Sequence, residues 1–585
     1  MLFSKDMTAS NTLRQQICDS YIADETTAIN DLMAGVQLTE NERDTIAHRA
    51  HALITAIRKQ QRKKTSIDTL LDEYQLTSAE GRAFMCLAEA LLRIPDQHTA
   101  IALIADKLMI ADWRSHISKS RFVSINLRTR IFVLATAILS FSHEQQWFKR
   151  TLFRCITPLI VKATYFFIRK MAEQFVLGQS IDDALQKSKS WQKRAYCFSY
   201  DMLGESARSK KDELRYFEQY ATAIKTIGLQ AKSHDIRENP GISVKLSALC
   251  CRYTFPQQER VFAELIPRLK KLAMLAKKHN ISLIIDAEES SRLELSLDVF
   301  EALYLDSDLA RWQGFGLAVQ AYQKRAPAII DWLIKLSEKR NRQIMVRLVK
   351  GAYWDSEIKW AQEKGLTDYP VYTTRAATDV SYLICAQKLL AARQYVYPQF
   401  ATHNAYTVAS ILQIDNSGAG YEFQRLHSMG QALYDQILKQ TVVKCRVYAP
   451  VGKYVDLLSY LVRRLLENGA NSSFVNNVVD DTYTIDSLIT DPIDILQQDH
   501  NNPATPLPRD IYQNEFTPKR ISASGFDLSD RNALVVLKQK ISPLLTTQLN
   551  FIPPQASVLI HNPANHQEIV GGVQFDNKTT LESKI

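Results

Sequence analysis

Polar side chains recur where short apolar runs of this sequence end. Lys245 follows "GISV", Asp286 follows "SLII", and Arg347 lies within "QIMVRLV". The same pattern gives Glu288, Glu289, Gln320, Lys350, Thr402, His403, Asn404 and Tyr448. Each has a structural explanation, since Asp286 could cap a helix, Lys245 could pair with a carboxylate, and 402–404 could begin a helix. If the runs are neighbouring strands, however, these side chains meet at one edge, which favours a polar ligand site.

A second candidate is the arginine pair in "SYLVRRLLENGANSSF", residues 459–474. Helical periodicity places the leucines of this segment on one stripe and Arg463, Arg464 and Glu467 on the opposite face. That face could simply be solvated. The helix follows the last candidate strand, however, so the face could instead look onto the polar edge, where two arginine forks would suit a carboxylate or a phosphate.

Eight candidate strands would position these residues. They lie at 195–203, 242–249, 282–288, 315–322, 343–349, 396–404, 421–427 and 442–450, and amphipathic segments such as 260–279 and 325–340 separate them. Strands alternating with helices over about 280 residues predict an α/β fold, a (β/α)₈ TIM-type barrel, better than an open sheet. Active sites of such barrels lie at the carboxyl ends of the strands.

The remaining chain divides into two predicted regions. Helical periodicity dominates residues 1–190, which we expect to form an all-α arm and helical domain ahead of a barrel at 191–480. Residues 481–585 contain "NNPATPLPRD" and look like a linker and tail after residue 500.

Composition excludes several classes of protein. With 46% hydrophobic and 23% charged residues, the 585-residue chain is typical of a folded, soluble protein, and a net charge of +10 is a mild excess for this length. Its eight cysteines form no C-x-x-C pair, which predicts neither a metal site nor a disulfide framework and fits a reducing cytoplasm. No signal peptide is visible, and the greasiest stretch, 155–178, carries four charges that argue against a membrane span.

The barrel motifs resemble a known family. "GISVKLSAL", "IIDAEESSRLELSLD", "GLAVQAYQKR", "MVRLVKGAYWDSEIK", "FATHNAYT", "YEFQRLHSMG", "RVYAPVG" and "YLVRRLLENGANSSFV" closely resemble the proline dehydrogenase domain of the bifunctional proline utilization (PutA) flavoproteins. The resemblance implies FAD-dependent oxidation of L-proline to Δ1-pyrroline-5-carboxylate, the first step of proline catabolism to glutamate. It further implies hydride transfer from proline C5 to flavin N5, and electron transfer to a ubiquinone-type acceptor at the membrane.

The resemblance also implies roles for individual residues. Arg463 and Arg464 would clamp the proline carboxylate with Lys245, and Tyr353, Leu426 and Tyr448 would surround the ring. Lys245, Asp286, Arg347 and Tyr448 would be the catalytic residues, with Arg347 donating to flavin N5, where a fixed cation favours the reduced state. The remaining flavin-lining residues would be Gln320, Val349, Lys350, Gly351, Ala352, Trp354, Thr402, His403, Asn404 and Glu467, with no metal.

Two features depart from the family pattern. No ribbon-helix-helix pattern precedes the helical region, so we expect no DNA binding. "ASVLIHNPANHQEIVGGVQFD" resembles the opening of an aldehyde dehydrogenase domain, but that chemistry needs a cysteine nucleophile and the last cysteine, Cys445, lies in the eighth candidate strand. We therefore expect no aldehyde dehydrogenase activity, and a cytoplasmic protein that touches the inner face of the membrane transiently.

Two alternatives stay open at this point. Lys245 could form a Schiff base in a barrel lyase, which would need no flavin. Alternatively, residues 1–190, with the basic run "IRKQQRKK" at 57–64, could be a non-enzymatic module that binds nucleic acid or a membrane beside an inert barrel.

Overall fold

The computed structural model describes residues 12–61, 99, 175–415, 417–452, 474–478, 482–498, 505–513, 520–546 and 558–584. Three predicted site residues, Arg463, Arg464 and Glu467, lie outside the described residues. So does most of the region between residues 62 and 174, which was predicted to be helical.

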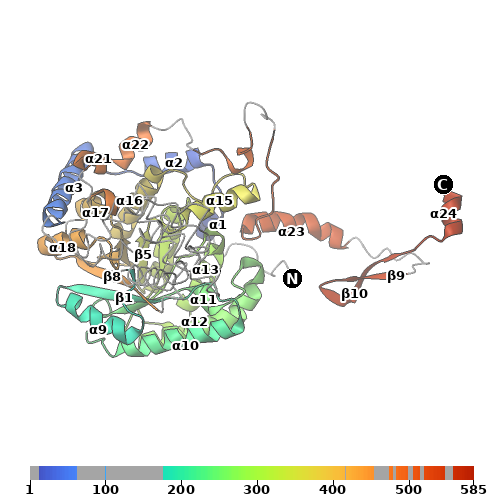
Figure 1. Ribbon diagram of the computed structural model, residues 1–585, viewed down its shortest axis with the longest axis horizontal. Helices are drawn as coiled ribbons and strands as arrows, with labels where there is room; N and C mark the ends of the chain where they lie inside the picture. The colour runs from blue at the N-terminus through green and yellow to red at the C-terminus, as the bar shows by residue number, and fades with distance from the viewer. Residues whose placement is uncertain are drawn as a thin grey trace, which may run out of the picture.

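Eight parallel strands close into one barrel, as predicted (Figure 1). Each strand pairs with the next, and β1 pairs with β8. The strands are β1 Tyr196–Met202, β2 Gly241–Val244, β3 Leu283–Ile285, β4 Phe315–Gln320, β5 Ile344–Val349, β6 Val396–Ala401, β7 Glu422–Leu426 and β8 Lys444–Val451. Nearly all strand residues are buried, because helices cover the outside and side chains fill the interior.

One predicted strand is partly a helical turn. The strand predicted at 242–249 ends at Val244, and Leu246–Leu249 form the single helical turn α11. The prediction is wrong there because a short apolar run is compatible with either a strand or a buried helical turn. Lys245 therefore lies at the junction, where the chain leaves the barrel wall.

Helices between the strands form the outer layer. They are α10 Lys210–Gly228, α12 Gln258–Lys278, α13 Leu293–Tyr304, α14 Ala326–Arg340, α15 Trp354–Lys364, α16 Arg375–Ala391, α17 Ala405–Ile414 and α18 Gln431–Gln440, with α9 Ile181–Gln192 before β1 and short turns η3 Phe255–Gln257, η4 Ser290–Arg292 and η5 Ser307–Leu309. Helix α12 shows why they pack on the barrel: Val261, Leu265, Leu269, Leu272 and Ala276 recur on one face and are fully buried.

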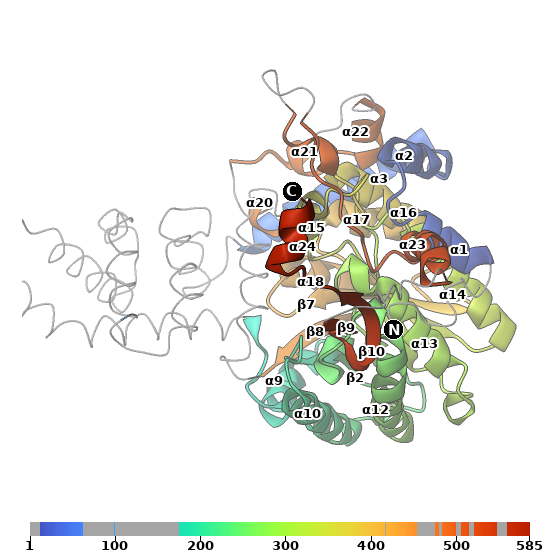
Figure 2. The same cartoon turned by 90° about the vertical axis from the view of Figure 1, so that its right-hand side faces the viewer.

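The N-terminal helices pack around the outside of the barrel. They are α1 Thr12–Asp19, α2 Glu25–Ala34 and α3 Glu40–Gln61, which contact α14, α16, and both α17 and α18, respectively. Buried Arg14 of α1 forms ion pairs with Glu294 at 3.0 Å and Asp298 at 2.6 Å, both on α13. Figure 2 shows this arm, in blue, beside the barrel helices. The predicted boundary near residue 190 stays a prediction.

After the barrel come α20 Phe474–Asn477, α21 Ile485–Leu488, α22 Pro492–Gln498, η7 Pro508–Asp510, α23 Arg531–Thr546, β9 Val558–Asn562, β10 Asn565–Val573 and α24 Lys578–Lys584. The prediction of loop-like sequence after residue 500 is wrong for 531–546 and 558–584. Buried Leu534 and the ion pair of Arg531 with Asp298 at 2.7 Å hold α23 on the body. Figure 1 shows the β9–β10 hairpin outside the barrel. None of the helices in the described ranges is long and apolar enough to span a bilayer.

Candidate active site

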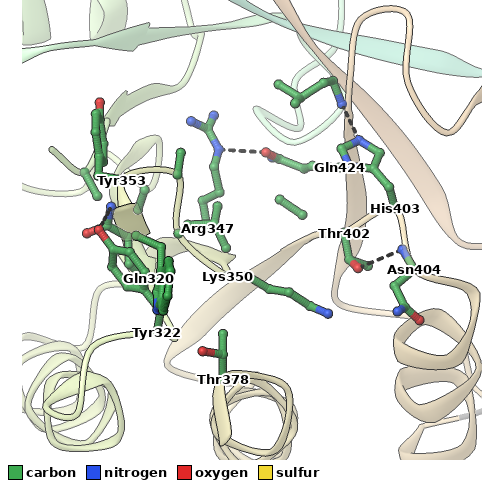
Figure 3. Close-up of a pocket in the computed structure, with 18 of the residues that line it drawn as sticks. Gln320, Tyr322, Arg347, Lys350, Tyr353, Thr378, Thr402, His403, Asn404 and Gln424 are labelled. Atoms are coloured by element: carbon green, nitrogen blue, oxygen red, sulfur yellow. Dashed lines mark hydrogen bonds between the residues drawn. The ribbon is translucent and has the colours of Figure 1, made fainter. Parts of the chain in front are cut away.

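A cavity of about 720 Å³ opens at the carboxyl ends of the barrel strands (Figure 3). Every residue to which the family resemblance gave a role, and that the structure describes, lines it, whereas Glu288 and Glu289 of the predicted polar edge do not. The lining residues with such a role are Lys245, Asp286, Gln320, Arg347, Val349, Lys350, Gly351, Ala352, Tyr353, Trp354, Thr402, His403, Asn404, Leu426 and Tyr448. The cavity has the size of pockets that hold small molecules and cofactors.

At one end of the cavity, Lys245 and Tyr448 are held between two carboxylates. Lys245 Nζ donates to Asp201 Oδ2 at 2.9 Å and to Asp286 Oδ2 at 3.3 Å. The Tyr448 hydroxyl lies 2.7 Å from Asp201 Oδ2 and 2.6 Å from Asp286 Oδ2. The sequence suggested that Lys245 could simply pair with a carboxylate. That pairing is present, and Lys245 also lines the cavity.

The Tyr448 hydroxyl bridges the two carboxylates, and its one proton lies between two close carboxyl oxygens. Burial raises the pKa of Asp201 against the opposing charge of Lys245, and nearby Asp286 raises it further. Asp286 also pairs with two cations, Lys245 at 3.3 Å and Arg347 at 2.7 Å. This end of the cavity therefore holds two fixed cations, which suit an anionic group.

Arg347 is fixed from several sides. Its Nε donates to Gln424 Oε1 at 2.7 Å, Nη1 to Asp286 Oδ1 at 2.7 Å, and Nη2 to Ser243 Oγ at 3.0 Å and Ser199 Oγ at 3.3 Å. A guanidinium has five N–H groups, so one N–H on Nη1 has no acceptor among the described residues. The Arg347 guanidinium is therefore a rigid cation with one N–H group that can donate to a ligand.

The opposite side of the cavity is shaped for a larger polar ligand. Thr373, Thr374, Arg375 and Thr378 line it at the N-terminus of α16, where backbone N–H groups and the helix dipole favour a phosphate. Gly351 has φ +136°, and a Cβ there would lie 2.5 Å from the Tyr322 ring, so only glycine lets the chain pass this close. A helix N-terminus for a phosphate and a glycine at a close passage of the chain are features of dinucleotide-binding sites.

Residues 402–404 both begin a helix and line the cavity. Asn404 is the N-cap of α17, with its side chain accepting from Thr407 N at 3.1 Å, which confirms the helix-start explanation for this residue. His403 Nε2 accepts from Leu426 N at 3.0 Å, so this ring nitrogen is unprotonated. Both side chains still line the cavity.

Sequence reasoning missed three parts of the site. Asp201 is the last residue but one of the strand "YCFSYDM", and the available signal was an aspartate near the end of a predicted strand. Thr373, Thr374 and Arg375, where α16 begins, could have been recognised as an N-cap sequence, "TTR". Gln424 had no signal of its own, because a glutamine within a predicted strand is not specific for any chemistry.

Glu288, next to this site, should make stability depend on pH. Its side chain is 6% exposed, and burial raises its pKa to about 6 against the opposing charge of Arg292. Because the folded-state pKa exceeds the usual 4.5, ionisation destabilises the folded state; the penalty is absent below pH 4.5 and complete above pH 6. We expect Glu288→Gln to raise the free energy of unfolding by about 2 kcal/mol more at pH 7.5 than at pH 4.5. Denaturant unfolding at both pH values measures this, and equal effects at the two would contradict it.

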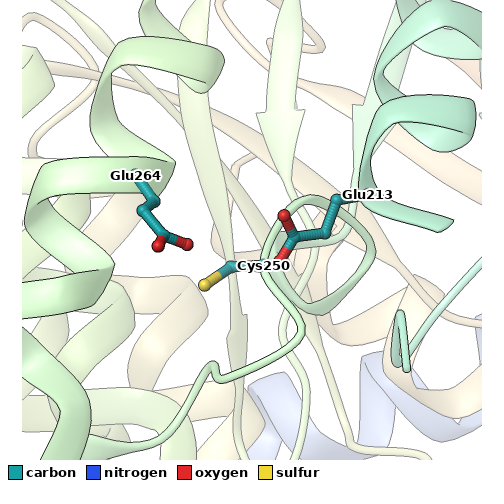
Figure 4. Close-up of side chains that lie close together, drawn as sticks. All are labelled: Glu213, Cys250 and Glu264. Atoms are coloured by element: carbon teal, nitrogen blue, oxygen red, sulfur yellow. The ribbon is translucent and has the colours of Figure 1, made fainter. Parts of the chain in front are cut away.

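A second group of side chains resembles a cation site but is already neutralised. Potential ligand atoms of Glu213, Cys250 and Glu264 lie within 4.8 Å of one another (Figure 4). Arg268 Nη1, however, lies 2.8 Å from Glu213 Oε2, and Lys210 contacts both glutamates. An ion-pair network explains this group better than a metal site.

Fold and cavity together define a (β/α)₈-barrel protein with a polar ligand site at the carboxyl ends of its strands. A family model described as "Proline dehydrogenase" matches residues 184–477, half of the chain and all eight strands. The chain belongs to the proline dehydrogenase family. A model described as "Proline utilization A proline dehydrogenase N-terminal domain" matches 11–58. The resemblance predicted from the barrel motifs is confirmed.

Curated and solved relatives agree with this assignment. The chain is 43% identical over 614 residues to "Bifunctional protein PutA" of Escherichia coli (strain K12). The alignment covers all of this chain and 46% of the relative. It is 26% identical over 308 residues to "Proline dehydrogenase 1" of Bacillus subtilis (strain 168), covering 52% of this chain and 89% of that one. A crystal structure of a Bradyrhizobium japonicum Proline Utilization A mutant matches with a TM-score of 0.70 and 44% identity, covering 89% of this chain and 53% of that one.

The chain therefore spans about half the length of the PutA relatives it matches. A further model, described as "DNA-binding domain of Proline dehydrogenase", matches residues 66–175, nearly all of which lie outside the described ranges. The expectation of no DNA binding, which rests on the missing ribbon-helix-helix pattern, stays an untested prediction beside this match. So does the expected absence of aldehyde dehydrogenase activity.

Proposed function

We propose that this protein oxidises L-proline to Δ1-pyrroline-5-carboxylate, with FAD as the hydride acceptor and a membrane quinone as the final electron acceptor. The observation that carries the proposal is the convergence of Lys245, Asp286, Arg347 and Tyr448 at one end of a cavity whose other end suits a phosphate. In this proposal the protein acts in the cytoplasm and contacts the inner face of the membrane only while it reduces the quinone.

The charges of the site support a zwitterionic amino acid as substrate. Proline must lose its water shell on entering a buried cavity, and an unpaired carboxylate there would cost several kcal/mol. Lys245, with Arg463 and Arg464 from the family resemblance, would compensate that carboxylate. The amine must be neutral before C5 can release hydride, and the positive charges of Lys245 and Arg347 would lower its pKa.

The cavity also supports FAD as the cofactor. The N-terminus of α16 with Thr373, Thr374 and Arg375 would hold the pyrophosphate. Bound FAD would take up the hydride at flavin N5. Arg347 would direct its remaining N–H toward the position where negative charge builds on reduction.

The Schiff-base alternative is disfavoured by the surroundings of Lys245. A nucleophilic lysine needs a lowered pKa. Burial lowers the pKa of Lys245, but the charges of Asp201, Tyr448 and Asp286 outweigh burial and hold it well above its usual value. The amine is therefore kept protonated, as a binding cation requires.

The arginine clamp gives a prediction for residues outside the described ranges. We expect Arg463→Met and Arg464→Met each to raise KM for proline at least about tenfold, because each removes a bidentate partner of the carboxylate. Flavin content should change little. Steady-state kinetics and the ratio of flavin to protein absorbance measure both. Unchanged KM in both variants would exclude the clamp.

The proposed function is tested by a visible absorption spectrum recorded before and after anaerobic addition of L-proline, with D-proline as the control. We expect a flavin spectrum that bleaches only with L-proline. A flavin spectrum unaffected by proline would overturn the substrate, and a protein that cannot take up added FAD would overturn the cofactor.

A further inference from the structure

A chain of buried polar side chains runs through the barrel below the cavity. It begins at Arg446 of β8, passes through Glu422 and Gln424 of β7, and ends at Arg347 of β5. All four residues are at most 3% exposed. Arg446 Nε donates to Glu422 Oε1 at 2.7 Å, Gln424 Nε2 donates to the same oxygen at 2.8 Å, and Arg347 Nε donates to Gln424 Oε1 at 2.7 Å. Figure 3 shows the last of these bonds.

The direction of this chain is fixed by chemistry. An ionised carboxylate only accepts hydrogen bonds, and a guanidinium only donates them. The Gln424 amide lies between the two, so its NH₂ group must face Glu422 and its oxygen must face Arg347. Glu422 in turn is held in place by Arg446, whose other nitrogens donate to the backbone oxygens of Arg237, Phe198 and Asn239.

Gln424 anchors the Nε edge of the Arg347 guanidinium, and among the described residues it is the one that accepts a hydrogen bond from Nε. The other edge is held by Asp286 and the two serines. Without an acceptor at Nε, the plane of the guanidinium could rotate, and the one remaining N–H on Nη1 would lose its fixed direction into the cavity.

We propose that Glu422, acting through Gln424, is a positioning residue that fixes the orientation of Arg347 toward the bound flavin and thereby sets the flavin reduction potential. This inference rests on the proposed function. Glu422 does not line the cavity and has no hydrogen bond to Arg347, and the amide of Gln424 connects the two side chains.

The barrel supplies a matched control for this proposal. Gln399 of β6 is also a fully buried glutamine and also donates to Glu422 Oε1, at 2.9 Å. It has no hydrogen bond to Arg347, although the two are register partners on neighbouring strands. Gln399→Met and Gln424→Met therefore remove the same chemical group from the same acceptor, and only the second breaks the connection to Arg347.

The experiment is a reductive titration of each FAD-loaded variant with dithionite, which gives the midpoint potential without using proline. We expect Gln424→Met to lower the potential by about 30 mV, equivalent to about tenfold for two electrons, and Gln399→Met to change it by less than about 10 mV, or about twofold. Gln424→Leu provides a second test with a different side-chain shape if the methionine variant does not fold. In the same samples, the rate of flavin reduction by proline should fall about tenfold only for the Gln424 variants.

Equal potentials for wild type and both Gln424 variants would overturn the positioning role, as would equal shifts in the Gln399 and Gln424 variants. Anaerobic bleaching of the wild type by proline separates these results from failure of the proposed function. If wild type bleaches and the potentials do not differ, only the positioning role is wrong. If wild type takes up no FAD, both proposals fall.

Discussion

Replacing Arg347 by methionine is expected to lower the rate of flavin reduction by proline by about a hundred- to a thousandfold. The variant loses a rigid cation whose other contacts, to Asp286, Gln424 and the two serines, are already fixed before the reaction begins. Such preorganised charge acts mainly on the transition state, so kcat should fall far more than proline affinity. Single-turnover reduction followed by flavin absorbance measures the chemical step directly.

Arg347→Lys is the informative control. It retains the positive charge but cannot contact Gln424, Asp286 and Ser243 at once, because an ammonium has no planar fork. We expect an intermediate rate. If the lysine and methionine variants are equally impaired, the geometry of the guanidinium matters more than its charge. A methionine variant that reduces its flavin at the wild-type rate would remove Arg347 from the mechanism.

The second large effect is expected for Lys245→Met. Removing one partner from a buried ion pair leaves the other uncompensated, here Asp201, which is fully buried and whose only cationic partner within the described ranges is Lys245. We expect the free energy of unfolding to fall by about 3 kcal/mol. KM for proline should rise about a hundredfold, because the carboxylate of the substrate loses a cation as well.

The double variant Lys245→Met/Asp201→Asn separates these two effects. Asparagine has the shape of aspartate without its charge, so most of the lost stability should return, while proline binding should stay weak. Thermal unfolding and steady-state kinetics of the single and double variants measure both quantities. Recovery of KM together with stability would mean that Lys245 supports the fold and does not contact the substrate.

The alternation of strands and helices was enough to predict the barrel. Eight short apolar runs with helical segments between them are specific for this fold, and all eight strands are present. The same rule located the site, because polar residues at the ends of strands meet at one rim. Lys245, Asp286, Arg347 and Tyr448 come from four different strands or strand ends and share one cavity.

The interior of the barrel could not be predicted in the same way. In a parallel barrel both faces of a strand are buried, so the alternation that marks an exposed face is missing. Asp201, Glu422 and Arg446 would each be expected at the surface from their chemistry alone, whereas all three are at most 1% exposed. Their burial depends on partners from other strands, and a single sequence does not show which residues those are.

The hydrogen bond between Tyr448 and Asp201 also joins the last strand of the barrel to the first. β1 and β8 pair in register, with Tyr196 opposite Cys445, so the seam closes only when both have left the ribosome. At synthesis rates of ~5–20 residues per second, β8 follows β1 by roughly 12–50 s. During that interval the growing chain has an unpaired strand edge, and Asp201 lacks its hydrogen bond with Tyr448. The pocket is therefore among the last parts of the molecule to form, and a nascent chain released before β8 would have no site at all.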